Sequence, residues 1–244
     1  MVLEDVTFSN VSWGSKPEMI SLNKFEIKVA LLPLLSGDIQ VNRLILLEPD
    51  ILLETNKKGL ENWVFASKEV EKNESVAYDS EMSLPAIVIN EILIKNASIH
   101  YKDGVTGQET TLAIDNIELK EKGDSGPLSL TIKAAYNEIP VEVKGTIGRI
   151  VTLIENDNYP LDLIVKVSDA NIGLKGNIAQ PMEGQGLDLD LAFNIDSLSK
   201  LSKLAGSDLP QLGPVSLTGK VTESKGGVFN KSDEIIAREN RFFR

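Results

Sequence analysis

The sequence predicts a mainly β protein made of antiparallel strands that each have one apolar and one polar face. Apolar and polar side chains alternate over most of the chain, which is the pattern of a strand with one buried face. Short polar breaks separate consecutive alternating runs, as they do in β-hairpins. Helical spacing is confined to residues 197–204, where leucines recur on one side before Gly206.

The first predicted region covers residues 1–66. An extended segment ends at Gly14, and Pro49 interrupts a later run that resumes after it. A turn at residues 56–59 leads to Asn62 and Trp63, which we interpret as a hydrogen-bonded corner plug. The strands predicted in this region lie at residues 6–13, 24–29, 39–47 and 51–54.

Residues 67–84 are charged and have no apolar stripe, which predicts a linker or a short exposed helix. A second β region is predicted over residues 85–229. Its strands are expected at residues 87–101, 110–120, 128–136, 139–147, 161–167, 172–178, 187–195 and 215–221. The last residues, 230–244, do not alternate and are predicted to form a tail.

The clearest hairpin covers residues 128–147. Leu128, Leu130 and Ile132 alternate with polar residues, and the alternation resumes after Asn137 and Glu138. At about 3.3 Å per residue, each arm is roughly 30 Å long. The same pattern repeats on both sides of a break at residues 169–170, so most of the second region presents an apolar face.

Composition excludes several classes of protein. No apolar run approaches the ~18 residues of a spanning helix, and the formal net charge of -11 argues against nucleic acid and against electrostatic docking on anionic headgroups. The chain has no cysteine, which excludes disulfides and thiolate metal sites. Because Met1 is closely followed by Glu4 and Asp5, we expect that a targeting segment is missing from this sequence.

The apolar faces must be sheltered from water. Roughly twenty large aliphatic side chains, at about 1.5–3 kcal/mol each, represent about 30–60 kcal/mol of burial free energy. This is several times the net stability of an ordinary domain, about 5–15 kcal/mol. With so little helix predicted, the sheet must cover itself as a sandwich, a barrel or a trough. The composition does not choose among the three.

Several stretches carry a family resemblance in their order and spacing. After the extended segment at residues 6–13 come Leu32-Pro33-Leu34-Leu35-Ser36-Gly37-Asp38-Ile39-Gln40-Val41, Leu46-Leu47-Glu48-Pro49-Asp50-Ile51-Leu52-Leu53-Glu54, Gly59-Leu60-Glu61-Asn62-Trp63, Ile99-His100-Tyr101-Lys102-Asp103, Pro127-Leu128 and Leu209-Pro210. Together they resemble the bacterial AsmA family over residues 4–229.

The resemblance implies a long, curved, antiparallel-rich sheet folded into an apolar trough, a β-taco, with one or two short helices. It implies a periplasmic protein held in the inner membrane by an N-terminal anchor, which is missing from this chain. It also implies partners, namely phospholipid acyl chains, the membrane and outer-membrane assembly components. The chain is short for a bridge across the periplasm, so we expect the N-terminal portion of a longer protein or a minimal member.

Three functional hypotheses follow. The first is a groove that binds or conducts phospholipid, the second a scaffold that affects outer-membrane protein assembly and targeting, and the third a closed β-sandwich without a ligand. For the first hypothesis, the predicted lipid-binding residues are Leu128, Leu130, Ile132, Val141, Val143, Leu161, Leu163, Val165, Val167, Ile172, Leu174, Leu189, Leu191 and Phe193.

No catalytic residue, metal site or cofactor is predicted. His100 is the single histidine and lies within a strand, so we interpret it as structural. Asp188 and Asp190 are spaced like metal ligands, but both fall on the polar side of a regular alternation and are expected to face solvent. The sequence therefore predicts a protein that is not an enzyme.

Overall fold

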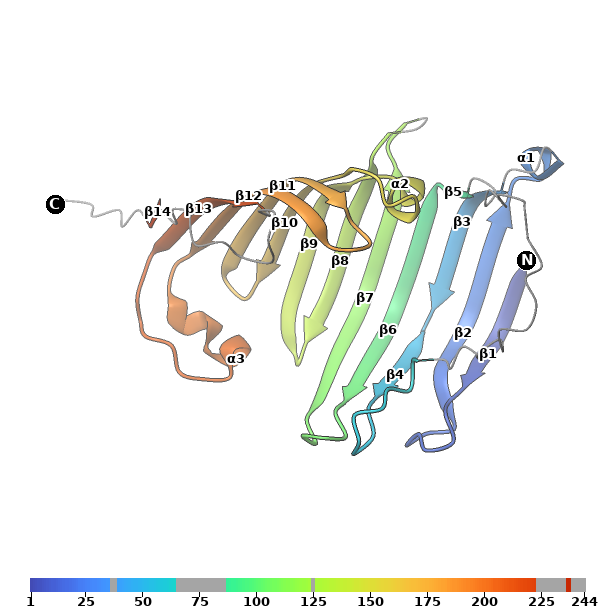
Figure 1. Ribbon diagram of the computed structural model, residues 1–244, viewed down its shortest axis with the longest axis horizontal. Coiled ribbons are helices and arrows are strands. Elements are labelled where there is room, and N and C mark those ends of the chain that lie inside the picture. The colour runs from blue at the N-terminus through green and yellow to red at the C-terminus, as the bar shows by residue number, and fades with distance from the viewer. Residues whose placement is uncertain (36–38, 65–86, 124–125, 223–235, 238–244) are drawn as a thin grey trace, which may run out of the picture.

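The computed structural model describes residues 1–35, 39–64, 87–123, 126–222 and 236–237, and the statements below concern these residues. They form one sheet of fourteen strands, most of which pair in the antiparallel sense (Figure 1). The predicted class, mainly β and antiparallel-rich, is confirmed. The charged segment at residues 67–84 lies outside the described residues.

The second half of the sheet is a run of antiparallel neighbours in sequence order. The strands are β6 (Glu91–Lys102), β7 (Glu109–Glu121), β8 (Leu128–Tyr136), β9 (Ile139–Ile147), β10 (Tyr159–Val167), β11 (Ala170–Gln180), β12 (Gln185–Ile195), β13 (Val215–Thr222) and β14 (Ile236–Ala237). A two-residue turn joins β8 to β9 and another joins β10 to β11, whereas α2 (Ile150–Ile154) lies between β9 and β10, and η1 (Leu198–Leu201) and α3 (Ser202–Ala205) lie between β12 and β13.

The first half joins this run through parallel pairing. β3 and β4 follow one another beside β2, and both run parallel to β6, while β5 extends the parallel pairing along β3. β1 pairs with β2 as the outer strand at this end of the sheet. The strands are β1 (Val2–Ser9), β2 (Glu18–Val29), β3 (Ile39–Leu47), β4 (Asp50–Glu54) and β5 (Ile87–Ile89).

The predicted hairpin at residues 128–147 is confirmed. Asn137 and Glu138 occupy its turn with φ values of 45° and 67°, the left-handed pair of a two-residue hairpin loop. The strand predicted at residues 6–13 is wrong at its end, since β1 stops at Ser9. There the chain turns, because the Asn10 amide donates to the Pro17 carbonyl at 2.8 Å.

Four short helical segments accompany the sheet: α1 (Leu31–Leu35), α2 (Ile150–Ile154), the 3₁₀ helix η1 (Leu198–Leu201) and α3 (Ser202–Ala205). The helix predicted at residues 197–204 is confirmed as η1 followed by α3, and it ends at Gly206 with φ at 66°. The sequence did not predict α1 or α2, because five residues are too few to show a helical period.

Left-handed residues keep the apolar face continuous through the first half of the sheet. Asn96 in β6 has φ at 53° and Glu48, between β3 and β4, has φ at 55°. At this level the alternation restarts, so that Ile94 and Ala97, three residues apart, pair with Ile117 and Ile114. The next strand, β8, alternates regularly. Ile117 and Ile114 of β7 both lie opposite residues on one face of β8, because β7 has a register shift at the same level.

Candidate functional site

One row of apolar side chains crosses the sheet from β1 to β13. Residues directly opposite each other on neighbouring strands lie on the same face, so the register places one apolar residue after another in line. We call this set the apolar row: Leu3, Phe25, Leu46, Ile94, Ile117, Ile132, Val143, Val165, Ile172, Phe193 and Leu217. Ten strand spacings of about 4.8 Å make it about 48 Å long.

The apolar row remains partly exposed. None of its side chains is fully buried, and Leu3 at the β1 edge is 46% exposed. Buried residues lie to either side of the row, for example Leu130 at 9% directly beside it, and Leu128 at 2% and Ile139 at 7% toward the strand ends. The face that carries the row, here called the apolar face, is thus sheltered toward the strand ends and partly open along the row.

The structure places all fourteen predicted lipid-binding residues on the apolar face. Five belong to the apolar row: Ile132, Val143, Val165, Ile172 and Phe193. Four form a parallel row with Gly145: Leu130, Leu163, Leu174 and Leu191. The others lie toward the strand ends: Leu128, Leu161, Leu189, Val141 and Val167. That these residues bind lipid stays a prediction.

One margin of the apolar face is covered by η1. Leu198 and Leu201 pack against a cluster in which Val167 and Ile195 are buried at 7% and 3% exposure. The Lys200 ammonium lies 2.5 Å from the Asp169 carboxylate in the turn between β10 and β11, and this pairing raises the pKa of Lys200. Sequence reasoning did not foresee this cover, because a helical period does not say where the helix docks.

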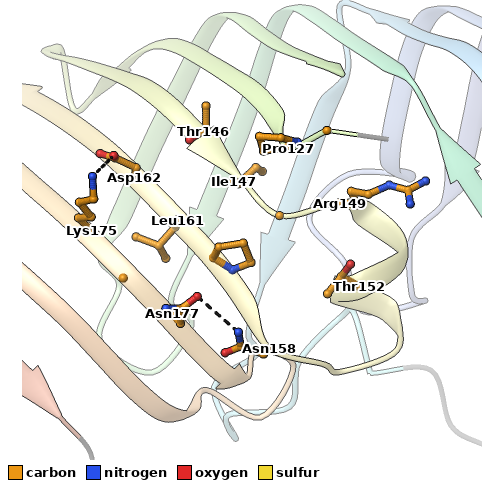
Figure 2. Close-up of a pocket in the computed structure, with 14 residues that line it drawn as sticks. Pro127, Thr146, Ile147, Arg149, Thr152, Asn158, Leu161, Asp162, Lys175 and Asn177 are labelled. Carbon is orange, nitrogen blue, oxygen red and sulfur yellow. Dashed lines mark hydrogen bonds and ion pairs between the residues drawn. The ribbon is translucent and has the colours of Figure 1, made fainter. Parts of the chain in front are cut away.

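The opposite margin, near α2, holds a cavity of about 570 Å³ (Figure 2). Residues of both faces line it, since Asp162 and Lys175 of the opposite face take part as well as Ile147 and Leu161. The Asn158 side-chain amide in its wall lies 3.5 Å from the Asn177 side-chain oxygen. Beside it, the Tyr159 hydroxyl donates to the Gly148 carbonyl at 2.9 Å. Burial raises the pKa of Tyr159. The sequence held no signal for this cavity, since its walls come from separate strands and loops.

The other face of the sheet is polar. The Lys175 ammonium lies 2.9 Å from the Asp162 carboxylate, and the Lys220 ammonium lies 2.7 Å from that of Asp188. These contacts raise the pKa of both lysines. Asp188 is exposed and ion-paired, so its predicted position on the polar face is confirmed. In the described part of the chain, no three acidic or histidine side chains gather as metal ligands would.

His100 lies between strands on the polar face. Its Nε2 atom is 3.1 Å from Asp50 Oδ1 and its Nδ1 atom is 3.3 Å from the Thr111 hydroxyl. These contacts join β4, β6 and β7. The predicted structural interpretation of this histidine agrees with its strand-to-strand contacts.

The predicted corner plug is confirmed at the end of β4. The Asn62 side chain is fully buried, and its amide donates to the Leu52 carbonyl at 2.9 Å. The Trp63 ring lies 6.2 Å from the Tyr101 ring, centroid to centroid. Tyr101 extends the apolar face at this end of the strands, and the indole packs beside it.

The fold and site define a class: a single wide β-sheet with one polar face and one partly open apolar face. The AsmA family model matches residues 1–180, and the chain belongs to the AsmA family. It is similar to the AsmA family protein YhjG of Escherichia coli K12, with 25% identity over 93% of this chain and 36% of that protein. The chain thus spans about a third of that relative's length. No solved structure matches it. The described residues contain no helix able to cross a membrane.

Proposed function

We propose that this chain binds phospholipid through its acyl chains along the apolar row. Such binding would contribute to conducting phospholipid across the periplasm from the inner membrane and would support outer-membrane lipid homeostasis. The observation that supports this proposal is the row itself. Eleven apolar side chains stand in register from β1 to β13, and all remain partly exposed.

The dimensions suit extended acyl chains. The hydrocarbon core of a bilayer is about 30 Å thick and contains two leaflets, so one acyl chain spans about 15 Å. A row of about 48 Å therefore accommodates about three chain lengths end to end. Its side chains are aliphatic or phenyl groups, without hydrogen-bond donors or acceptors. The row is therefore expected to recognise the acyl chain and to discriminate little among headgroups.

Glycines within the strands support a trough. Gly145 in β9 and Gly176 in β11 have φ values of 154° and 150°, and glycine inside a strand commonly marks a bend or a close approach of backbones. A Cβ atom at either position would lie 2.0 Å from the carbonyl oxygen of the next strand. Bending here would curl the sheet around the apolar row and shelter a bound acyl chain from water.

Native mass spectrometry of the purified chain, after exposure to phospholipid vesicles, tests the proposal. We expect phospholipid adducts and a gain in thermal stability with lipid, because a ligand that binds the folded state stabilises it. Val165→Asp places a charge on the apolar row and is expected to abolish the adducts. Its matched control is Ile164→Asp, since Ile164 is the adjacent residue, lies on the polar face and is 53% exposed.

The outcomes separate the hypotheses. Loss of adducts in Val165→Asp with retention in Ile164→Asp supports the groove, provided that both variants keep a cooperative unfolding transition. If wild-type protein takes up no phospholipid and gains no stability from it, the proposal is wrong. If Val165→Asp instead unfolds, the row is a closed core in which an unpaired charge is intolerable.

A further inference from the structure

Leu31 and Leu32 of α1 are the most exposed large apolar side chains among the residues that the structure describes. Leu31 is 74% exposed and Leu32 is 80% exposed. The sequence Leu-Leu-Pro-Leu-Leu over this helix contains no polar side chain. Single exposed leucines are ordinary, but two adjacent ones in an entirely apolar helix form a protrusion that requires a partner or a lipid environment.

The position of α1 makes it accessible. It connects β2 to β3, and the Ala30 amide donates to the Gln40 carbonyl at 2.9 Å, which closes the base of the connection. Figure 1 shows α1 projecting past the strand ends at the edge of the sheet where β1 lies. The apolar row reaches the same edge through Phe25 and Leu3. The protrusion and the open end of the apolar face therefore lie at one corner of the molecule.

We infer that α1 inserts into the surface of a lipid bilayer, with Leu31 and Leu32 among the acyl chains. A stable protein interface buries about 800 Å² on each partner, and a five-residue helix is too small to supply that area. No side chain of α1 carries a hydrogen-bonding group that could specify a protein partner. A bilayer requires neither a large contact area nor such a group.

The charge balance makes this contact apolar in character. The chain has a formal net charge of -11, which opposes electrostatic attraction to anionic lipid. The nearest lysine on β2, Lys28, has its ammonium 3.7 Å from the Glu26 carboxylate. Binding through α1 is therefore expected not to require anionic lipid and not to be weakened by salt. This contact does not depend on whether the apolar row binds lipid.

Flotation of the 244-residue chain with vesicles of phosphatidylethanolamine and phosphatidylcholine, with and without phosphatidylglycerol, tests the inference. Wild-type protein is expected to float with both compositions at low and high salt. The double variant Leu31→Ser, Leu32→Ser is expected to have a vesicle partition coefficient lower by at least about tenfold, because two leucines lose their burial in the acyl region. Leu60→Ser is the matched control, since Leu60 is 58% exposed and follows β4 at the other end of the strands.

A fluorescence measurement gives an independent readout. The chain has no cysteine, so Leu32→Cys and Leu60→Cys each carry a single environment-sensitive dye. Vesicles are expected to shift the emission of the dye at position 32 to the blue and to leave that at position 60 unchanged. The inference is overturned if wild-type protein does not float, if the double variant floats as well as wild type, or if both dyes respond alike. Because Leu31 and Leu32 lie off the apolar row, the double variant is expected to keep its phospholipid adducts, which separates this inference from the proposed function.

Discussion

Asn62 and Glu54 are joined by two hydrogen bonds although eight residues separate them. The Glu54 backbone amide donates to Asn62 Oδ1 at 2.9 Å, and the Asn62 backbone amide donates to the Glu54 backbone carbonyl at 3.0 Å. The Asn62 side chain also donates to Asn10 Oδ1 at 3.1 Å, and Asn10 in turn donates to the Glu54 carboxylate at 2.9 Å. This closed polar network ties the end of β1 to the end of β4.

Removal of the Asn62 side chain is expected to destabilise the sheet. Asn62→Ala leaves the Glu54 amide and the Leu52 carbonyl without their partner in a buried site, at a cost of about 3 kcal/mol in the free energy of unfolding. Urea denaturation measures the change. Asn171→Ala, at an exposed position on the polar face, is expected to change stability by less than about 0.5 kcal/mol. Equal effects of the two substitutions would refute the importance of the network.

The Glu54 carboxylate makes this network sensitive to pH. Burial alone would raise the pKa of Glu54, but the hydrogen bonds from Ser15 and Asn10 and the charge of Lys102 outweigh it, and the pKa is lowered from its usual value of 4.5. A carboxylate with a lowered pKa stabilises the folded state above that usual value, and the contribution is lost as the pH falls through the folded-state pKa.

Glu54→Gln is therefore expected to lower the free energy of unfolding by about 2 kcal/mol at pH 7, because hydrogen bonds to a charged group are lost. The difference from wild type is expected to narrow as the pH falls below 4.5, where the wild-type carboxylate is also neutralised. Urea titrations at several pH values give the comparison, with Glu138→Gln in the exposed hairpin turn as a control. A difference that stays constant with pH would contradict the assignment.

Alternation in the sequence predicted the faces of the strands but not all of their neighbours. The hairpin turn at Asn137 and the apolar side of β10 were readable, because side-chain period and turn residues are local properties. The parallel pairing of β3 with β6 was not readable, since period fixes which face a residue occupies and not which strand lies beside it. The bond from Asn62 to Asn10, 52 residues away, and the cover of Val167 by Leu201 likewise depend on tertiary arrangement.

Substitution by alanine is expected to have opposite effects on stability at two glycines that lie in one row on the apolar face. Gly145 and Gly219 both belong to the row that contains Leu163 and Leu191. A Cβ at Gly145 would lie 2.0 Å from the Asp162 carbonyl oxygen, whereas a Cβ at Gly219 would meet nothing within 4 Å. Gly145→Ala is expected to cost about 2 kcal/mol or more, and Gly219→Ala to be neutral or to stabilise by about 0.5 kcal/mol. Thermal unfolding of both variants measures this, and equal stability would refute a close backbone approach at Gly145.

Val165 and Val167 allow the openness of the apolar face to be measured, because they share a strand, a face and a chemistry. Val167 is buried at 7% exposure in the cluster under η1, while Val165 on the apolar row is partly exposed. Val167→Ala leaves a cavity and is expected to cost about 2 kcal/mol, whereas Val165→Ala removes atoms that water already reaches and is expected to cost about 1 kcal/mol.

The two substitutions are expected to rank in the opposite order when the quantity compared is the stability gained from phospholipid. A lipid chain on the apolar row touches the position of Val165, so Val165→Ala reduces the stability gained from lipid. Val167 is already covered by protein, and its truncation is expected to leave that gain unchanged. Urea unfolding of both variants with and without phospholipid separates the two effects. If the two substitutions cost the same without lipid and change its effect equally, the apolar face is closed along its whole width, and the acyl chain has no place on it.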